Sequence, residues 1–319
     1  MLSRVAESIY WMNRYMERIE NYARFVSVNS NLSLDAPGLF AEEWEPLLTA
    51  TADNYLFYQY HQTPTRENVI DFMTFDQRNP NSIFSCLSMA RENARTIREV
   101  LPKELWEHLN GFYLHLKEIS KHKEEERVSH DTLYEFIKKG AQLFWGMIDS
   151  TLSRDEGYHF GRLGRFIERA DKTSRFLDVN YFAIPSQSQK TASPQELLIW
   201  SAVLKSVSAF NMYRQKYKSM EPVHLVEFLI LDKIFPRSIY YCIREAELSL
   251  YEISGRRFQD SYSNEAERAI GKLRNAIEFK TIDEIFEEGL HGYLDSFQRA
   301  NNQIGQEVFD QYFAWKPIE

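Results

Sequence analysis

The sequence predicts an all-helical protein made of two copies of one helical unit, residues 1–151 and 152–319. Three observations predict this: few helix-breaking residues, apolar side chains spaced by three and four, and an internal repeat in which two blocks recur in the same order. Helical hairpins of this length bury their apolar faces poorly alone. We therefore expect the copies to pack as one globular unit about a pseudo-two-fold axis.

Composition supports a folded helical chain and excludes several classes of protein. With 44% hydrophobic and 14% aromatic residues the chain can bury a large core, and only 12 Gly and 10 Pro favour long helices. A net charge of -8 argues against nucleic acid as a partner, and no apolar run reaches the ~18 residues of a membrane span. Cys86 and Cys242 form no disulfide framework. We expect a cytoplasmic protein with no membrane or nucleic-acid partner.

The repeat is visible in two blocks. Between residues 14–29 and 165–180, seven positions are identical: Arg14/Arg165, Glu17/Glu168, Arg18/Arg169, Arg24/Arg175, Phe25/Phe176, Val28/Val179 and Asn29/Asn180. The second block, at an offset of 156 residues, matches Phe72/Phe228, Asp76/Asp232, Pro80/Pro236, Ser82/Ser238, Ile83/Ile239, Cys86/Cys242 and Ala90/Ala246. The five extra residues fall in the Pro- and Ser-rich stretch 183–195, as expected for a loop.

Periodicity and capping signals predict each element in order. The first helix has its apolar residues on one face and runs to about Asn29. Further helices are predicted at 44–60, 66–77, 82–100, 103–126 and 131–150, with counterparts in the second copy. Capping boxes predict helix starts at Ser153/Glu156, Ser193/Glu196 and Thr281/Glu284, and Ser82 is predicted to cap the helix that follows Pro80.

The first helix of each copy also carries a charged face. In copy one it holds Arg14, Glu17, Arg18, Glu20 and Arg24; in copy two it holds Arg165, Glu168, Arg169, Asp171 and Arg175. Spacing places Glu17 within reach of Arg14 and Arg24 on its own helix. Since exposed ion pairs contribute only ~0–1 kcal/mol, identical charges in diverged copies suggest that the two helices face each other with these charges partly buried.

Two interpretations of this face remain open. The charges form a structural Arg–Glu network at the seam between copies. Alternatively, the guanidinium groups bind a carboxylate or phosphate while Glu17 or Glu168 orients them or transfers protons. Arg91 and Arg95 belong to another basic run, which lacks a charge-matched counterpart in copy two and is either a solvated helix face or a second binding site.

Metal and nucleotide motifs are weak. Three Glu-x-x-His pairs, Glu156/His159, Glu221/His224 and Glu288/His291, have the spacing used by di-iron bundles, which leaves a di-metal oxidase as a remote alternative. Two of the three glutamates are already explained, because Glu156 is a predicted cap and Glu221 precedes Pro222 at a helix start. There is no Walker A loop and no Gly-rich dinucleotide motif. We expect no metal and no cofactor in this chain.

The sequence resembles the bacterial alpha-E domain family over nearly its whole length. The resemblance rests on the N-terminal run 1–21, on the string Leu163–Asp171 (LGRFIERAD) and on the string Ala90–Arg95 (ARENAR). In the first copy Asn13 stands where the family often has Gly. The resemblance implies an all-helical protein associated with a circularly permuted ATP-grasp ligase and a transglutaminase-like cysteine peptidase, in systems that form and break amide or peptide bonds.

Three functions follow as hypotheses. The first is an accessory component of an ATP-grasp ligation system whose charged face binds a carboxylate-bearing peptide or metabolite, or docks the ligase, with ATP and Mg on the partner ligase. The second is an enzyme using Glu17 or Glu168 as acid or base. The third is the di-metal oxidase.

Overall fold

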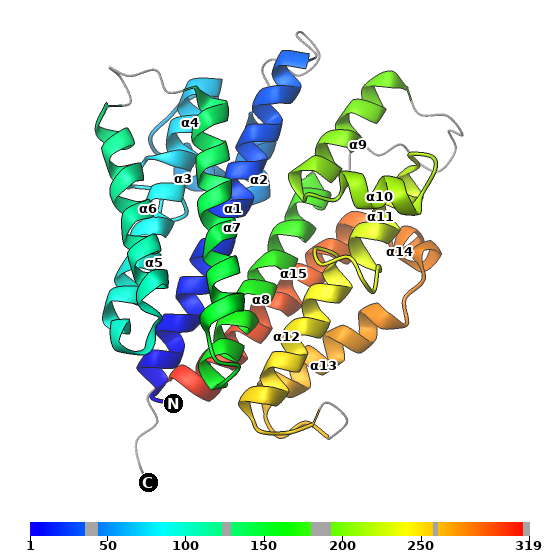
Figure 1. Ribbon diagram of the computed structural model, residues 1–319. Coiled ribbons are helices and arrows are strands. Elements are labelled where there is room, and N and C mark those ends of the chain that lie inside the picture. The colour runs from blue at the N-terminus through cyan, green and yellow to red at the C-terminus, as the bar shows by residue number, and fades with distance from the viewer. Residues whose placement is uncertain (36–43, 123–128, 180–192, 258–260, 315–319) are drawn as a thin grey trace.

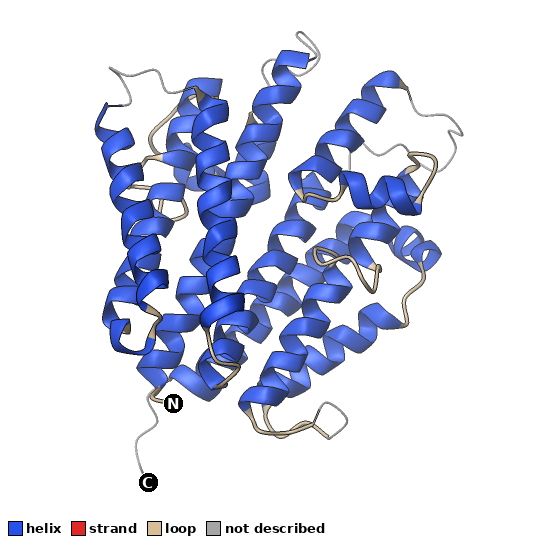
Figure 2. Ribbon diagram, viewed as in Figure 1, coloured by secondary structure: helices blue, strands red, loops and turns tan. Residues whose placement is uncertain are grey.

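The computed structural model describes residues 1–35, 44–122, 129–179, 193–257 and 261–314, and within them the protein is helical with no strand (Figure 2). In the first half the helices are α1 (Ser3–Asp35), α2 (Glu45–Thr51), α3 (Asn54–Phe57), α4 (Arg66–Thr74), α5 (Ile83–Thr96), the 3₁₀ turn η1 (Arg98–Val100), α6 (Lys103–His122) and α7 (His130–Thr151). The second half holds α8 (Glu156–Val179), α9 (Pro194–Ser206), α10 (Phe210–Lys216), α11 (Pro222–Ile230), α12 (Ile239–Ile253), α13 (Glu265–Glu278), α14 (Ile282–Glu288), α15 (Leu290–Val308) and the π-helical turn η3 (Phe309–Phe313).

The predicted helices are present, but several bounds differ. The helix predicted at 66–77 ends at Thr74, and the one predicted at 82–100 is α5 followed by the separate turn η1. The single helix predicted at 44–60 is two short helices, because Ala52 adopts a left-handed conformation with φ of 60° and turns the chain between α2 and α3. The first helix continues beyond Asn29 to Asp35. Most of the loop predicted at 183–195 lies outside the described residues.

Helix starts follow the predicted caps in all but one case. The boxes at Ser193/Glu196 and Thr281/Glu284 are confirmed, and Ser82 accepts a hydrogen bond from the backbone N–H of Ser85. The box at Ser153/Glu156 is wrong. Asp155 takes that role, since its carboxylate accepts the N–H groups of Gly157 and Tyr158, which places the start of α8 two residues later.

Two long helices, α1 and α8, cross at the centre of the molecule and organise the rest. Helices α5 and α7 pack on α1, while α12 and α15 pack on α8 (Figure 1). Their crossing is close because Gly164 lies against α1, where an added Cβ would meet the carbonyl oxygen of Tyr10 at 2.5 Å. Within the described residues no helix is both long and apolar enough to cross a bilayer.

The two halves interlock. Helix α2 packs on α8, and α9 packs on α1, so each half places its second helix on the first helix of the other. The rings of Phe25 and Phe176, which the sequence repeat aligns with each other, stack with centroids 4.3 Å apart. At the far end of the chain, Phe313 of η3 packs against Tyr10 of α1, with ring centroids 5.4 Å apart.

Replacing Gly164 by Ala tests the importance of the close crossing. We expect Gly164→Ala to lower the free energy of unfolding by about 1–3 kcal/mol, because the new methyl group meets backbone that cannot move aside cheaply. Gly146→Ala in α7 is the matched control. An added Cβ there meets nothing within 4 Å, so the helix gains up to ~1 kcal/mol. Equal effects of the two substitutions in chemical denaturation would contradict this account of the crossing.

Candidate functional site

A cluster of charged side chains lies buried where α1 crosses α8. Its four acidic members, Glu17, Glu20, Glu168 and Asp171, are at most 6% exposed. The partner of Glu17 differs from the one that helical spacing predicts. Neither Arg14 nor Arg24 pairs with it; the main partner is Arg169 of α8. The seam between the halves is thus made by ion pairs from one helix to the other.

Glu17 is held from three directions. Arg169 donates from Nε and Nη2 to the two carboxylate oxygens at 2.9 and 2.8 Å. Arg237, which precedes α12, donates from Nη1 at 3.0 Å, and Asn21 donates from its side chain at 3.0 Å. Such bidentate, charge-assisted bonds are about twice as strong as neutral ones. Both carboxylate oxygens of Glu17 are therefore bonded inside the protein.

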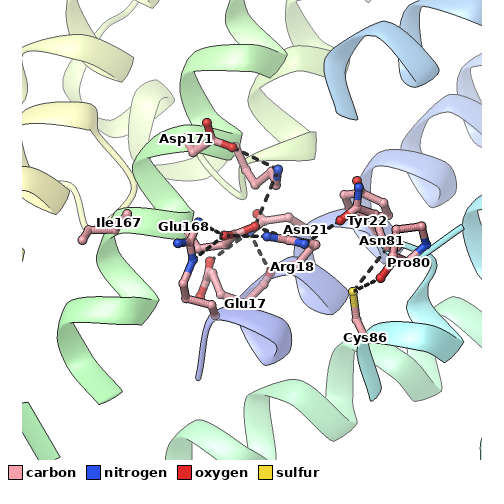
Figure 3. A network of polar contacts seen from close by, with 12 residues as sticks. Glu17, Arg18, Asn21, Tyr22, Pro80, Asn81, Cys86, Ile167, Glu168 and Asp171 are labelled. Carbon is pink, nitrogen blue, oxygen red and sulfur yellow. Dashed lines mark hydrogen bonds and ion pairs between the residues drawn. The ribbon is translucent and has the colours of Figure 1, made fainter. Parts of the chain in front are cut away.

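Glu168 has the mirror-image environment on α8. Arg18 donates from Nε and Nη2 at 2.7 and 3.1 Å, and Arg14 donates from Nε at 3.0 Å. Figure 3 shows Arg18 of α1 placed between Glu168 on one side and Asn81 on the other, where Asn81 accepts a further bond from its Nη1. Two arginines of the first half thus bind Glu168, just as two arginines of the second half bind Glu17.

The ion pairs hold both central carboxylates in their charged form. Burial alone would raise the pKa of Glu17, but Arg169 and Arg237 hold it far below the ordinary range. Burial would also raise the pKa of Glu168, whereas Arg18, Lys172 and Arg14 hold it well below. Neither group exchanges a proton near neutral pH.

Two cations that the sequence patterns missed complete the network. Arg237 donates from Nη2 to Glu20 at 3.0 Å as well as binding Glu17, and Lys172 lies 3.0 Å from Asp171 and 3.6 Å from Glu168. The repeat aligns Arg237 with Asn81 and Lys172 with Asn21. Both extra cations therefore lie in the second half, at positions where the first half has Asn, and these unmatched charges within matched blocks are the signal that could have revealed them.

Arg165 is the exception among the central arginines. Its equivalent, Arg14, bonds to Glu168, whereas the Nε of Arg165 lies 3.7 Å from Glu17 and has no hydrogen-bond partner within the described residues. Its guanidinium instead stacks 4.0 Å from the ring centroid of Trp145. Burial and the nearby charge of Arg169 lower the pKa of Arg165 to about 10. Its positive charge is incompletely balanced.

Arg165 faces a cavity of about 250 Å³ between α7, α8 and α12. Arg162 and Arg169 line the same cavity, as does the carboxylate of Asp149. The remaining walls are largely aromatic, formed by Trp145, Tyr158, Phe166 and Tyr241. The volume lies just below the roughly 300–1,000 Å³ of sites for drug-sized ligands, so the cavity suits a small molecule.

The helical fold and the Glu-Arg ion pairs meet the description of one known family. The chain matches the model of a predicted alpha-helical domain with a conserved ER motif over residues 1–313. The chain belongs to the Alpha-E family. No curated protein and no solved structure matches it. In this Alpha-E chain the Glu-Arg sequences Glu17-Arg18 and Glu168-Arg169 supply the four side chains at the centre of the network.

The other basic residues predicted for the Alpha-E site lie at different distances from its centre. Arg24 pairs with Glu20, and Arg175 donates to Asp171 at 2.9 Å, so both extend the network. Arg91 and Arg95 are not brought to it. They bind Glu92 and Asn110 on the outer face of α5 and α6, where Arg91 also lies 4.9 Å from the ring centroid of Tyr113.

The Glu-x-x-His pairs do not converge in the Alpha-E fold. His291 binds Asp178 at 2.6 Å, and His224 lies 3.7 Å from Glu221 at the start of α11. Nowhere in the described part of the chain do three His, Cys, Asp or Glu side chains gather as metal ligands would. Cys86 and Cys242 are buried, and burial raises the pKa of each thiol to about 12, so they pack as small apolar residues.

Proposed function

We propose that this chain is a non-catalytic component of an ATP-grasp-dependent amide or peptide ligation system, and that it binds a carboxylate-bearing ligand in the cavity beside Arg165. The observation that carries the binding proposal is the state of Arg165. The Arg165 side chain is 21% exposed, its Nε has no hydrogen-bond partner within the described residues, and it lines a cavity in which a carboxylate could pair with its guanidinium. The ligase association is what membership of the Alpha-E family implies.

The contrast between the two halves supports this proposal. The network satisfies Arg14 and Arg18, and Arg24, whose Nε also lacks a partner, is held through its Nη atoms by Glu20 and Ser208. Arg165 is left over because Arg169 holds both oxygens of Glu17 and Arg237 holds Oε1 as well. The structural network and the binding site therefore coexist. The network fixes the helices, and Arg165 supplies a positive charge that the network leaves incompletely balanced.

We also propose that the two halves are copies of one unit related by a pseudo-two-fold axis. The reciprocal pairs support this, because Arg14 with Glu168 and Arg165 with Glu17 exchange aligned positions. The stack of Phe25 on its aligned residue Phe176 has the geometry expected at such an axis.

An acid–base role for Glu17 or Glu168 has no comparable support. Both carboxylates are 0% exposed, so no substrate atom reaches them without unfolding the crossing. Their lowered pKa values also make them weak bases at neutral pH, since an effective general base titrates near the working pH.

Binding is tested by titrating the protein with 3-phenylpropanoate, a carboxylate with an apolar body, in a calorimeter. We expect saturable binding that Arg165→Gln weakens about 10-fold or more, because a hydrogen bond to a charged group contributes roughly 1.5–3 kcal/mol. Arg165→Gln leaves Glu17 paired with Arg169 and Arg237, so the fold is retained. Arg95→Gln on the exposed face of α5 is the control and should bind as the wild type does.

The ligase association is tested with the ATP-grasp ligase of the same system. Wild-type chain should form a complex with it and raise its amino-acid-dependent ATP turnover, and Arg165→Gln should form the complex but raise turnover less. No complex and unchanged turnover would contradict the accessory role while leaving the binding result standing.

A further inference from the structure

The cavity beside Arg165 contains a second feature that a simple anion site does not need. Among its cations it holds one carboxylate, that of Asp149, on the exposed end of α7. Within the described residues its cation partner is Arg154, whose Nη1 lies 3.6 Å from Oδ1, beyond hydrogen-bonding distance. The Arg154 guanidinium is instead stacked on Tyr158, 4.1 Å from the ring centroid.

We infer that the ligand is a zwitterion, a free α-amino acid with an apolar or aromatic side chain, whose carboxylate binds Arg165 and whose ammonium binds Asp149. This inference rests on the proposed carboxylate site and names the class of molecule that fills it.

Helix geometry places the two charged groups at a suitable separation. Arg165 stacks on Trp145, and Asp149 follows Trp145 by four residues, so it lies one turn further along the same face of α7. One helical turn is about 5.4 Å. In an α-amino acid the ammonium and the carboxylate are attached to one carbon atom. If each group makes one hydrogen bond to its partner, the two partner side chains are separated by a distance of the order of one helical turn.

The connection between α7 and α8 orients the ligand. Only residues 152–155 join the two helices, so Asp149 and Tyr158 lie near the turn, and Trp145 and Arg165 lie further from it along the two helices. The ligand would lie between the two helices with its carboxylate away from the turn. Its side chain would then contact the aromatic walls, where Phe166 and Tyr241 lie with ring centroids 6.0 Å apart.

Other ligands fit the cavity less well. A phosphate would gain from the arginines but be repelled by Asp149, and a nucleotide exceeds a volume of about 250 Å³. A plain carboxylate leaves Asp149 with only Arg154, 3.6 Å away, as a charged partner. Only a molecule with both charges and an apolar body satisfies Arg165, Asp149 and the aromatic walls together.

Three ligands of similar shape test the inference by calorimetry on the full chain: L-phenylalanine, 3-phenylpropanoate without the ammonium, and phenethylamine without the carboxylate. We expect phenylalanine to bind about 10-fold or more tightly than 3-phenylpropanoate, and phenethylamine to bind more weakly than either, because the site has more cations than anions. Asp149→Asn should reduce the affinity for phenylalanine to that for 3-phenylpropanoate. Asp131→Asn, at the opposite and exposed end of α7, is the control and should change neither affinity.

The outcomes separate this inference from the proposed function. Equal affinity for phenylalanine and 3-phenylpropanoate, with no effect of Asp149→Asn, would overturn the zwitterion and leave the carboxylate site. Binding of neither would overturn both. Phenethylamine binding as tightly as phenylalanine would show that Arg165 does not hold the ligand, and would also overturn the inference.

Discussion

Glu17→Gln should lower the free energy of unfolding by about 3–5 kcal/mol, the largest effect on stability that we expect from a single charge-removing substitution. The substitution keeps the shape of the side chain but removes its charge, which leaves Arg169 and Arg237 buried without their shared counterion. An arginine cannot relieve this by losing a proton. Urea denaturation followed by circular dichroism measures the loss, and the slope with denaturant checks that the native state stays compact.

The control for this experiment is Glu92→Gln. Glu92 also accepts bonds from two arginines, Arg91 and Arg95, but its side chain is 42% exposed, and surface substitutions usually change stability within about 0.5 kcal/mol. A loss below about 1 kcal/mol for Glu17→Gln would mean that the buried pairs contribute no more than surface pairs do.

Acid provides an independent test of the same substitution. Because the folded protein lowers the pKa of Glu17, its charge stabilises the fold above the unfolded value of about 4.3, and this contribution is lost as the pH falls toward the folded value. The stability difference between wild type and Glu17→Gln should therefore narrow as the pH is lowered from 7 to 3. A difference in stability that stays constant across this pH range would show that Glu17→Gln acts by changing the packing and not by removing the charge.

Arg237→Asn should weaken ligand binding as strongly as Arg165→Gln does, although Arg237 is not among the residues that line the cavity. The substitution gives the second half the residue that the first half has at Asn81. Without Arg237, Glu17 loses one of its charged partners on Oε1, and Arg165, whose Nε lies 3.7 Å from Oε2, can close that gap and pair as Arg14 does with Glu168. Glu17 would then occupy the guanidinium group of Arg165 that otherwise binds the ligand.

Calorimetry with 3-phenylpropanoate measures the effect, and a second substitution tests its cause. Adding Glu17→Gln to Arg237→Asn removes the charge that captures Arg165, so the double variant should regain affinity even though it is less stable. If the double variant binds no better than Arg237→Asn alone, Arg237 does not act through Glu17.

The sequence predicted the helices and the buried charges because both depend on local spacing. Apolar residues three and four apart defined α1, and repetition of Glu17 and Arg18 as Glu168 and Arg169 indicated that the charges matter. The partners were predicted less well. On an isolated helix Glu17 reaches Arg14, but in the fold both turn to α8, since a buried pair across the crossing satisfies more donors.

Arg237 and the cavity could not be predicted from the same patterns. Arg237 lies in a connection between helices, where no periodicity relates it to α1, and only the crossing of α1 and α8 brings it to Glu17. The cavity joins residues of α7, α8 and α12, whose proximity depends on the tertiary fold. Asp149 carried no signal in the sequence because nothing near it along the chain suggests a ligand.

The interlocked crossing also affects how the chain emerges from the ribosome. Helix α1 is synthesised first, yet the arginines that neutralise Glu17 are Arg169 and Arg237, at least 152 residues later. At roughly 5–20 residues per second, Arg169 follows Glu17 after about 8–30 s and Arg237 after about 11–44 s. During that time the charged face of α1 stays in water, so the helix cannot be buried and its apolar face remains exposed. We therefore expect the nascent chain to bind a chaperone until α8 has been synthesised.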